Sequence, residues 1–340
     1  GENIAAKRWS EAQKKRIINS RVKPIELLLS KINGVSKTVR FISASAVGIY
    51  GDRKEEKITE VSKPGDGFLA DVCKQWEAPL LSTTSNITPT IMRIGLVITN
   101  KGGALPKMLP AFRAGVAGRL SHGEQYMSWI HITDLVNQFI YVIKNAPEHT
   151  VFNAVAPRPV SNYVFTTILA KELKRPAILP VPKLALKVAL GEMSTILLTG
   201  QKVIPQAFLD LNFDFKYRSI KDAIREEVKE VVNGERVFEQ HQWLPSPPSE
   251  VFPFFSDEYN LEKITPDFLG FKVTGKNTEQ IQSGTLIDYK LKIHGVTIKW
   301  KTEILEFVDG HHFIDQQLKG PYKKWFHKHE FHPVKNGTLM

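Results

Sequence analysis

The sequence has a single cysteine, Cys73, among its 340 residues, so it cannot form an internal disulfide. This cysteine usage is typical of a reducing compartment, and we expect a cytoplasmic protein. Long apolar runs are absent as well. The leucine-rich stretch 184–198 is interrupted by Lys187 and Glu192, and no window approaches the roughly 18 uncharged apolar residues of a membrane-spanning helix. The sequence therefore predicts no transmembrane segment.

Acidic residues are fewer than basic ones, 35 against 46, which gives a formal net charge of +11. The excess is local, because residues 1–40 carry +7 of it whereas residues 235–340 carry −1. Its densest part, Lys14-Lys15-Arg16, lies in a helical pattern without interleaved aromatic residues or zinc-finger spacing. We expect a solvated helix face and no nucleic-acid partner. A patch that binds a polyanion or a nucleotide phosphate is the alternative.

Apolar residues make up 42% of the chain and charged residues 24%, so a chain of this length is expected to bury a full core and to fold as two units. Continuous apolar runs, typical of strands buried on both faces, occur at 39–45, 87–98 and 151–155. Helical patterns lie between them at 67–83 and 133–144. This order predicts a doubly wound parallel sheet. A helical lobe beside it is predicted by the patterns at 162–173, 183–198 and 219–232.

The pattern changes at residues 233–234, after which apolar and polar residues alternate and turn signals recur. Such alternation is typical of antiparallel sheets. In the run LKIHGVTIKWKTEILEF, we expect one face of a strand to carry Ile298, Trp300, Thr302 and Ile304, with the charged residues between them on the other face. One helical segment, 248–264, interrupts the strands near the start of this unit.

Four segments carry a resemblance to a known family. They are SASAVGIYGD (43–52), FLADVCKQWE (68–77), GGALPKMLPAFRAG (102–115) and MSWIHITDLV (127–136). Together they resemble the epimerase-family branch of the short-chain dehydrogenase/reductase (SDR) superfamily. The segment 191–217 resembles the C-terminal helical segment of that branch. The resemblance covers residues 1–232 and implies a Rossmann-type fold that binds NADP(H).

In extended members of that superfamily, two features carry the acid-base chemistry: a serine after the strand that corresponds to residues 39–45, and a Tyr-x-x-x-Lys on the next helix. Ser45 matches the serine. The tyrosine and lysine positions fall on Leu69 and Cys73 when Glu77 is aligned with the glutamate that often follows the lysine. Neither residue can do the acid-base work, and this departure resembles the atypical SDRs. Ser45 is a catalytic candidate, with a structural cap at the strand end as the alternative.

Tyr50 and His131 are the other side chains that could serve as acid or base. His131 precedes Asp134 in WIHITD, and the alternative role of this pair is to pack and to begin a helix. The segment 127–129 is MSW, where nucleotide-sugar epimerases usually carry a basic residue that grips a diphosphate. A nucleoside-diphosphate sugar is therefore not the expected substrate, and the small-molecule substrate is left unidentified.

Residues at the strand ends are the expected cofactor contacts. Small residues in SASAVGIYGD let a cofactor approach the backbone, and by resemblance 93–95 would lie along the nicotinamide ribose. For Gly95, the alternative is that it relieves crowding between strand and helix. The expected cofactor-binding set is Gly1, Asn3, Ser43, Ser45, Arg93, Ile94 and Gly95.

A G-x-x-G-x-x-G loop is absent from the sequence, although the family places one after its first strand to hold the pyrophosphate. The opening residues GENIAAKRW resemble the segment after the fourth strand of that family, so Gly1 to Asn3 would border the cofactor. We therefore expect a fragment that does not bind NADP(H) tightly by itself, whereas the full-length form is expected to bind it.

The last unit resembles the START-like, or SRPBCC, helix-grip fold, in which an antiparallel sheet closes around a long helix and leaves an apolar cavity. The segments 245–273, HGVTIKWKTEILEF and GPYKKWFHKHEFHP carry the resemblance, which implies an apolar ligand. Six of the ten histidines follow residue 290. His327 and His329 would face one side of a strand and His332 the other, so without a fixed third ligand we expect no metal site.

Three segments are predicted: a partial NAD(P)-binding Rossmann domain at 1–160, a helical epimerase-family segment at 161–233 and a partial START-like domain at 235–340. The expected fold class is a partial doubly wound α/β sheet with a helical lobe, followed by an α+β helix-grip domain. The leading functional hypothesis is an atypical NADP(H)-dependent oxidoreductase or epimerase with a fused domain for hydrophobic ligands. The alternative is a non-catalytic NADP(H)-binding sensor or scaffold, which the replaced tyrosine and lysine favour.

Overall fold

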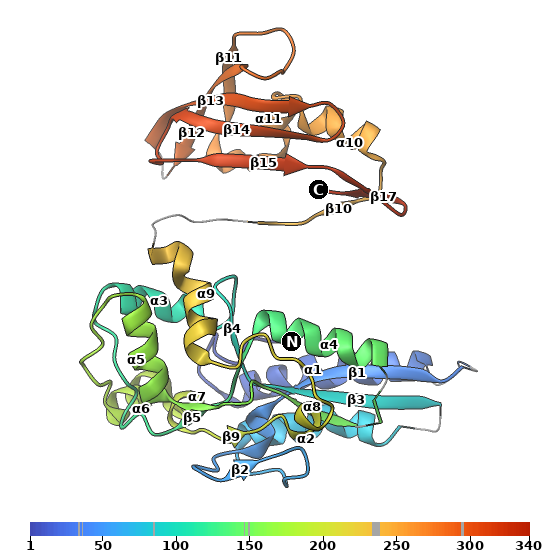
Figure 1. Ribbon diagram of the computed structural model, residues 1–340, viewed down its shortest axis with the longest axis vertical. Coiled ribbons are helices and arrows are strands. Elements are labelled where there is room, and N and C mark those ends of the chain that lie inside the picture. The colour runs from blue at the N-terminus through green and yellow to red at the C-terminus, as the bar shows by residue number, and fades with distance from the viewer. Residues whose placement is uncertain are drawn as a thin grey trace. The chain divides into compact units, whose positions relative to one another are not determined.

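The computed structural model describes the chain except residues 33, 34, 36, 84, 85, 146, 149, 233–238, 294 and 295. Backbone contacts divide the chain into two compact units, Gly1–Arg236 and Val237–Met340; many of their helices and strands carry labels in Figure 1. The change of pattern expected at 233–234 lies outside the described residues. None of the described helices combines the length and the apolar character needed to cross a membrane.

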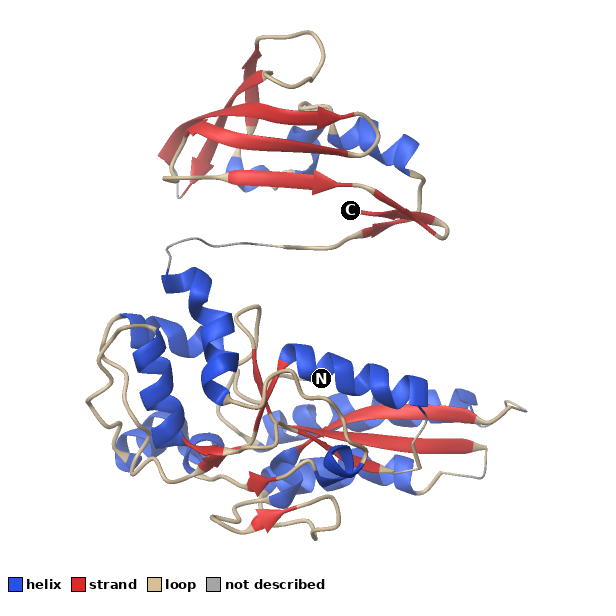
Figure 2. Cartoon of the chain, viewed as in Figure 1, coloured by secondary structure: helices blue, strands red, loops and turns tan. Residues whose placement is uncertain are grey.

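The first unit is organised around a parallel sheet in the order β1 (Val39–Ala46), β3 (Ile87–Ile94) and β7 (Val151–Ala154), whose strands lie among helices in Figure 2. Ile91 and Met92 of the central strand are adjacent in sequence and therefore point to opposite faces, yet both are fully buried. Both faces of the sheet are thus covered. The prediction of a doubly wound parallel sheet is confirmed for this unit.

The two faces of this sheet have separate cores. On one face, Ile91 shares a buried cluster with residues of α1 (Glu11–Ile32) and α2 (Phe68–Leu81). On the other face, Met92 shares a buried cluster with residues of α4 (Ile132–Asn145). Adjacent apolar residues are therefore favoured in the central strand, because the neighbouring side chains of Ile91 and Met92 meet helices on opposite faces.

The apolar run predicted as one strand at 87–98 is two strands. After β3, Gly95 leaves the ladder, and β4 (Leu96–Ile98) pairs in parallel with β6 (Trp129–His131) in a separate sheet. At the break the two backbones lie close together, since a Cβ on Gly95 would lie 2.4 Å from the carbonyl oxygen of Ser128. The apolar pattern does not reveal the break, because the residues on both sides of it are apolar.

The lobe segment predicted as one helix at 183–198 is also divided. It forms α6 (Lys183–Leu190), the 3-10 turn η2 (Gly191–Ser194) and α7 (Thr195–Leu198). Gly191 adopts a positive φ of 60°, a conformation that favours glycine and ends the first helix.

The other two lobe patterns form helices close to their expected positions, α5 (Asn162–Glu172) and α9 (Ile220–Val232), which share a buried cluster around Trp129. Short elements complete the description of this unit. They are η1 (Val47–Tyr50), α3 (Leu105–Arg113), α8 (Gln206–Asp210), β2 (Lys57–Ile58), β5 (Tyr126–Met127), β8 (Val160–Ser161) and β9 (Lys202–Val203).

The second unit contains a five-stranded antiparallel sheet, which agrees with the alternation of apolar and polar residues in its sequence. In spatial order, its strands are β11 (Lys272–Lys276), β12 (Leu286–Ile293), β13 (Val296–Val308), β14 (His312–Lys319) and β15 (Phe326–Glu330). A smaller antiparallel sheet has the order β10 (Trp243–Leu244), β17 (Gly337–Leu339) and β16 (His332–Val334).

The helical segment predicted at 248–264 is two helices, α10 (Pro248–Phe255) and α11 (Asn260–Ile264), with a short 3-10 turn, η3 (Asp267–Leu269), after them. The Asp257 side chain accepts a backbone N–H two residues on, at 3.0 Å, and so holds the turn between the two helices. The helix α10 packs on the sheet through Phe252, whose ring contacts those of Phe307 and Phe313 on the strands and that of Phe331 beyond β15.

The face pattern predicted along β13 is confirmed up to Ile304. Thr302 and Ile304 are 2% and 3% exposed, whereas Lys299 between the apolar positions is exposed. The alternation ends where the pairing with β14 shifts register between Ile304 and Glu306. Beyond this bulge, the period-2 rule no longer assigns the faces.

We expect Ile304→Ala to destabilise the second unit by about 2–4 kcal/mol, because it empties a buried position that packs with Val273 and Ile287. Leu305→Ala is the matched control, since Leu305 is the next residue and is 40% exposed; its expected cost is below about 1 kcal/mol. Urea unfolding followed by circular dichroism measures both. Equal losses from the two variants would contradict the assignment of faces.

Candidate functional site

Three polar side chains stand in one row across the parallel sheet. Each occupies the last position but one of its strand: Ser45 on β1, Arg93 on β3 and Asn153 on β7. The register pairs Ser45 with Arg93 and Arg93 with Asn153. Open α/β sheets place ligand-contacting groups at the carboxyl ends of their strands. This strand-end row is therefore the candidate functional site of the first unit.

The centre of the strand-end row is an ion pair with Glu77 of α2. The Glu77 carboxylate accepts from Arg93 Nε at 3.0 Å and from Nη2 at 2.7 Å, and its Oε1 also accepts from the Ser45 hydroxyl at 2.6 Å. Burial by itself would lower the pKa of the Arg93 guanidinium, but the hydrogen bonds and charge of Glu77 outweigh it, and the pKa is raised. Arg93 therefore stays charged inside the protein.

Tyr50, at the end of η1, joins the other members of the row. Its hydroxyl accepts from Arg93 Nη1 at 2.9 Å and donates to Asn153 Oδ1 at 2.7 Å. Burial raises the pKa of Tyr50, although the charge of Arg93 opposes the shift. The backbone N–H of Asn153 donates in turn to Glu60 Oε1 at 3.0 Å. The phenol is thus held protonated between a cation and a fixed amide.

These side chains are closed off from solvent. Tyr50 and Asn153 are 0% exposed, Glu77 is 2%, Ser45 is 3% and Arg93 is 6%. Buried polar groups are stable when they satisfy one another, as they do here. The network fixes the ends of three strands, the turn η1 and the helix α2 in one geometry.

Leu69, Cys73 and Glu77 lie on one face of α2, because they are spaced four residues apart. Leu69 and Cys73 lie under η1, within 4 Å of where a side chain on Gly48 would begin. Burial, and after it the charge of Glu77, raises the pKa of Cys73 to about 11, so its thiol is protonated at neutral pH. The positions matched to the tyrosine and the lysine therefore supply no acid-base group near pH 7.

Gly1 and Asn3 belong to a segment held against α1. The carbonyl of Glu2, between them, accepts from Arg21 Nη2 at 3.1 Å. The Asn3 side chain is used locally, because its Oδ1 accepts a backbone N–H two residues on, at 2.9 Å. The Arg21 guanidinium also lies over the ring of Trp76 on α2, 5.3 Å from its centroid. Through Arg21, this segment approaches α2.

Ser43, Ile94 and Gly95 lie beside the strand-end row. The hydrogen bonds of Ser43 and Gly95 go to backbone carbonyls of the sheet's strands. The Ser43 hydroxyl donates to the carbonyl of the next residue at 3.1 Å, and the Gly95 N–H donates to Ala154 at 3.1 Å. A glycine is needed at position 95 because the Ser128 carbonyl leaves no room for a side chain. The crowding therefore comes from a neighbouring strand segment rather than from a helix. The cofactor contacts of these residues stay predictions.

His131 lies at the end of β6, in another set of contacts. Its Nδ1 accepts from the Thr133 backbone N–H at 3.1 Å, and its Nε2 lies 2.9 Å from Glu227 Oε1 of α9. Its ring stacks on that of Tyr217 with the centroids 3.8 Å apart. Among the described contacts, none joins His131 to the strand-end row.

Asp134 uses its carboxylate in the same region. Its two oxygens accept from the backbone N–H groups of Lys216 and Tyr217 at 2.9 and 2.8 Å. The start of α4 is thereby tied to the segment that precedes α9. These are packing contacts, the alternative stated for the His131 and Asp134 pair, and the catalytic role of His131 stays a prediction. Ser45 and Tyr50, in contrast, are brought together through the strand-end row.

Two members of this network, Glu77 and Asn153, were not identified from the sequence as site residues. Glu77 served only to align the helix, and Asn153 stands in the apolar run VFNAV. A polar residue near the end of an otherwise apolar strand is costly to bury and so needs a partner. Three such residues, Ser45, Arg93 and Asn153, stand near the ends of the apolar runs, and this pattern could have indicated the network.

We expect Glu77→Gln to destabilise the first unit by about 3–5 kcal/mol, because it leaves Arg93 charged and buried without a counter-charge. Glu77→Leu combined with Arg93→Met removes both charges and is expected to be more stable than Glu77→Gln alone. The matched control is Asp71→Asn, which breaks an exposed ion pair with Lys74 on the same helix and should cost less than about 1 kcal/mol. Denaturant unfolding measures the free energy of unfolding of each variant. Equal losses from Glu77→Gln and Asp71→Asn would contradict the role assigned to the buried ion pair.

Gly95→Ala is expected to destabilise the cofactor-free chain by about 1–3 kcal/mol, because its Cβ would collide with the backbone at Ser128. Gly102→Ala is the control, since nothing lies within 4 Å of a Cβ there. Thermal unfolding without nucleotide measures both. Unchanged stability of the Gly95 variant would contradict the predicted collision with the Ser128 backbone.

Comparison with known proteins bears on the first unit. The sequence model of the NAD dependent epimerase/dehydratase family matches residues 1–154, which include the strand-end row, and that of a domain of unknown function, DUF1731, matches residues 181–227. An Arabidopsis thaliana epimerase family protein, a chloroplastic SDR39U1 homolog, is 40% identical over 221 residues. The chain spans 64% of that relative's length. The Mycobacterium leprae epimerase family protein ML0860 is 35% identical over 226 residues, which are 66% of this chain and 73% of that protein.

Two solved structures are similar to the same part of the chain. The human epimerase family protein SDR39U1, crystallised with NADPH, gives a TM-score of 0.64 at 29% identity and covers 67% of this chain and 79% of its own. A Corynebacterium glutamicum nucleoside-diphosphate sugar epimerase gives a TM-score of 0.53 at 30% identity, over 68% of this chain and 49% of its own. The resemblance carried by the four sequence segments is thereby confirmed, and the chain belongs to the epimerase family.

Proposed function

We propose that the protein binds NADP(H) at the carboxyl edge of the first unit's sheet and acts there as an atypical oxidoreductase or epimerase on a small molecule. The strand-end row carries the proposal, because it gathers Ser45, Arg93 and Asn153 where such sheets bind ligands. The NADPH in the human relative's crystal supports the choice of cofactor.

The residues at this edge fit the nicotinamide half of the cofactor. The segment SASAVG, which spans the end of β1 and the start of η1, is rich in small residues that let a cofactor approach the backbone. The chain has no G-x-x-G-x-x-G loop for the pyrophosphate, so the proposal for this chain concerns the nicotinamide half alone. When bound, NADP(H) supplies or accepts the hydride.

Ser45 is the side chain that we assign to the substrate or the nicotinamide. Its hydroxyl donates to Glu77, so its direction is fixed while its lone pairs can accept a hydrogen bond. Tyr50 is the second candidate for moving a proton. Because burial raises its pKa, Tyr50 would act as a proton donor rather than as a base at neutral pH.

A non-catalytic NADP(H)-binding sensor or scaffold is the second candidate function. Leu69 and the protonated thiol of Cys73 favour it, because they replace the acid-base pair of the extended members. The closed network around Arg93 also favours it, since a fully satisfied network has a structural use without any reaction.

For the second unit, we propose a START-like, helix-grip domain that holds an apolar ligand. The antiparallel sheet, the buried face of β13 at Thr302 and Ile304, and the helix α10 packed through Phe252 support this proposal. An alternating strand with one apolar face offers the wall that such a ligand needs.

The test titrates the full-length protein with NADPH and NADH, followed by nucleotide fluorescence, and then screens carbonyl compounds for hydride transfer. Saturable NADPH binding is expected, with turnover falling roughly a hundredfold in Ser45→Ala while NADPH affinity changes little. Ser30→Ala is the control, because that hydroxyl is exposed and donates within its own helix turn, to the carbonyl of Leu27. Failure to bind NADPH would overturn the proposal, and binding without hydride transfer would favour the sensor or scaffold.

A further inference from the structure

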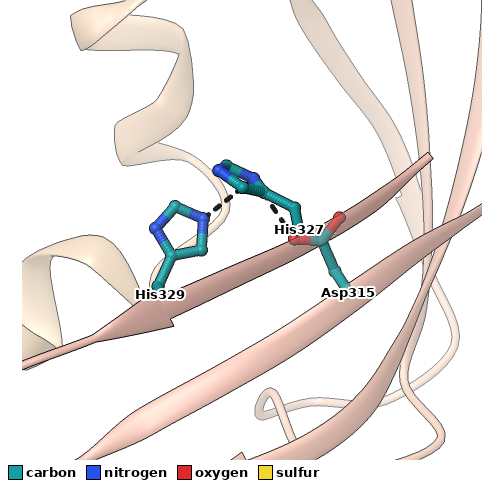
Figure 3. A group of neighbouring side chains, drawn as sticks. All are labelled: Asp315, His327 and His329. Carbon is teal, nitrogen blue, oxygen red and sulfur yellow. Dashed lines mark hydrogen bonds and ion pairs between the residues drawn. The ribbon is translucent and has the colours of Figure 1, made fainter. Parts of the chain in front are cut away.

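A second cluster of chemistry-bearing side chains lies in the unit Val237–Met340, on the strands β14 and β15. The antiparallel register places Asp315 directly opposite His327, and Phe313 opposite His329. Alternate residues of a strand share a face, so both imidazoles and the carboxylate project from the same side of the sheet. Figure 3 shows the three polar side chains converging there.

The distances between these side chains are those of groups that can share one ion. His329 Nε2 lies 3.1 Å from His327 Nδ1, and His327 Nδ1 lies 3.6 Å from Asp315 Oδ2. One ligand atom from each residue lies within 4.8 Å of the others. Ligands about 2.0–2.1 Å from a tetrahedral zinc ion are separated by roughly 3.3 Å. Two of the three separations are already close to this value.

His327 Nδ1 lies between the other two groups. It shares a hydrogen bond with His329 Nε2, whereas Asp315 Oδ2, at 3.6 Å, lies beyond hydrogen-bond distance (Figure 3). A metal ion bound by the lone pairs of all three groups would hold the carboxylate as well as both imidazoles.

The surroundings orient the ligands and leave one side accessible. The Phe313 ring stacks on the His329 imidazole with centroids 4.4 Å apart and so restrains that ring. The Asp315 side chain is 16% exposed and that of His327 is 48% exposed, so an ion and a water molecule can reach the group from the His327 side. Restrained ligands with one open side are typical of three-ligand metal sites.

We propose that Asp315, His327 and His329 bind a divalent transition-metal ion of the zinc class, with the fourth position open to water. Two imidazoles and one carboxylate are a ligand set that suits Zn²⁺. The reason for expecting no metal site was the lack of a third ligand, and the neighbouring strand supplies one in Asp315. His332 takes no part, because it lies on β16 in the other sheet. This site is independent of the function proposed for the first unit.

The test is calorimetric titration of Zn²⁺ into the untagged 340-residue chain after treatment with a chelator. The wild-type chain is expected to bind one equivalent at this site, and Co²⁺ in its place should give the intense visible absorption of a low-coordinate ion. His329→Ala and Asp315→Asn are each expected to weaken binding more than about a hundredfold, since even second-shell substitutions cost roughly 10–100-fold. Circular dichroism checks that each variant is folded.

His312→Ala is the matched control, because His312 lies on β14 but faces the other side, 3.4 Å from Glu306. It should bind Zn²⁺ as the wild type does. If either core variant fails to fold, His327→Gln replaces it, since His327 is the most exposed ligand. Absence of Zn²⁺ binding in the wild type, or equal weakening by His312→Ala and the ligand variants, would overturn the proposal.

Discussion

The buried ion pair between Glu77 and Arg93 is the interaction on which the first unit depends. A guanidinium removed from water is costly unless its donors and its charge are both matched, and here two parallel hydrogen bonds do so. The same carboxylate orients Ser45, and the same guanidinium orients Tyr50. One pair thus joins α2 to the ends of the strands. The arrangement of the candidate site follows from the hydrogen bonds and the counter-charge that Arg93 requires.

Much of the first unit could be predicted from the sequence, because strands buried on both faces are continuous apolar runs and the helices between them are amphipathic. The break at Gly95 could not, since its cause is the Ser128 backbone, which is distant in sequence. Ser45 and Tyr50 were identified as site candidates, but Glu77 and Asn153 join them only through register and helix facing. Partners across a sheet are set by long-range pairing, which local patterns do not contain.

The two candidate sites differ in how their charges are handled. In the strand-end row, a cation and an anion neutralise each other, and the side chains are shut away from solvent. In the cluster around Asp315, two imidazoles and a carboxyl group face one another, and the His327 side chain is half exposed. The first arrangement favours rigidity, and the second favours uptake of an ion. Clustered polar side chains therefore serve different ends according to what balances their charges.

The register of the strand-end row limits where the chain can gain or lose residues. Side chains alternate between the faces of a strand, so a single residue inserted ahead of Ser45, Arg93 or Asn153 would turn that side chain to the opposite face of the sheet. Two inserted residues would restore the face but displace the side chain along the strand, away from its neighbours. Length differences among related chains should accordingly fall in the loops, and an alignment gap inside β1, β3 or β7 ahead of these positions marks an alignment error rather than a deletion.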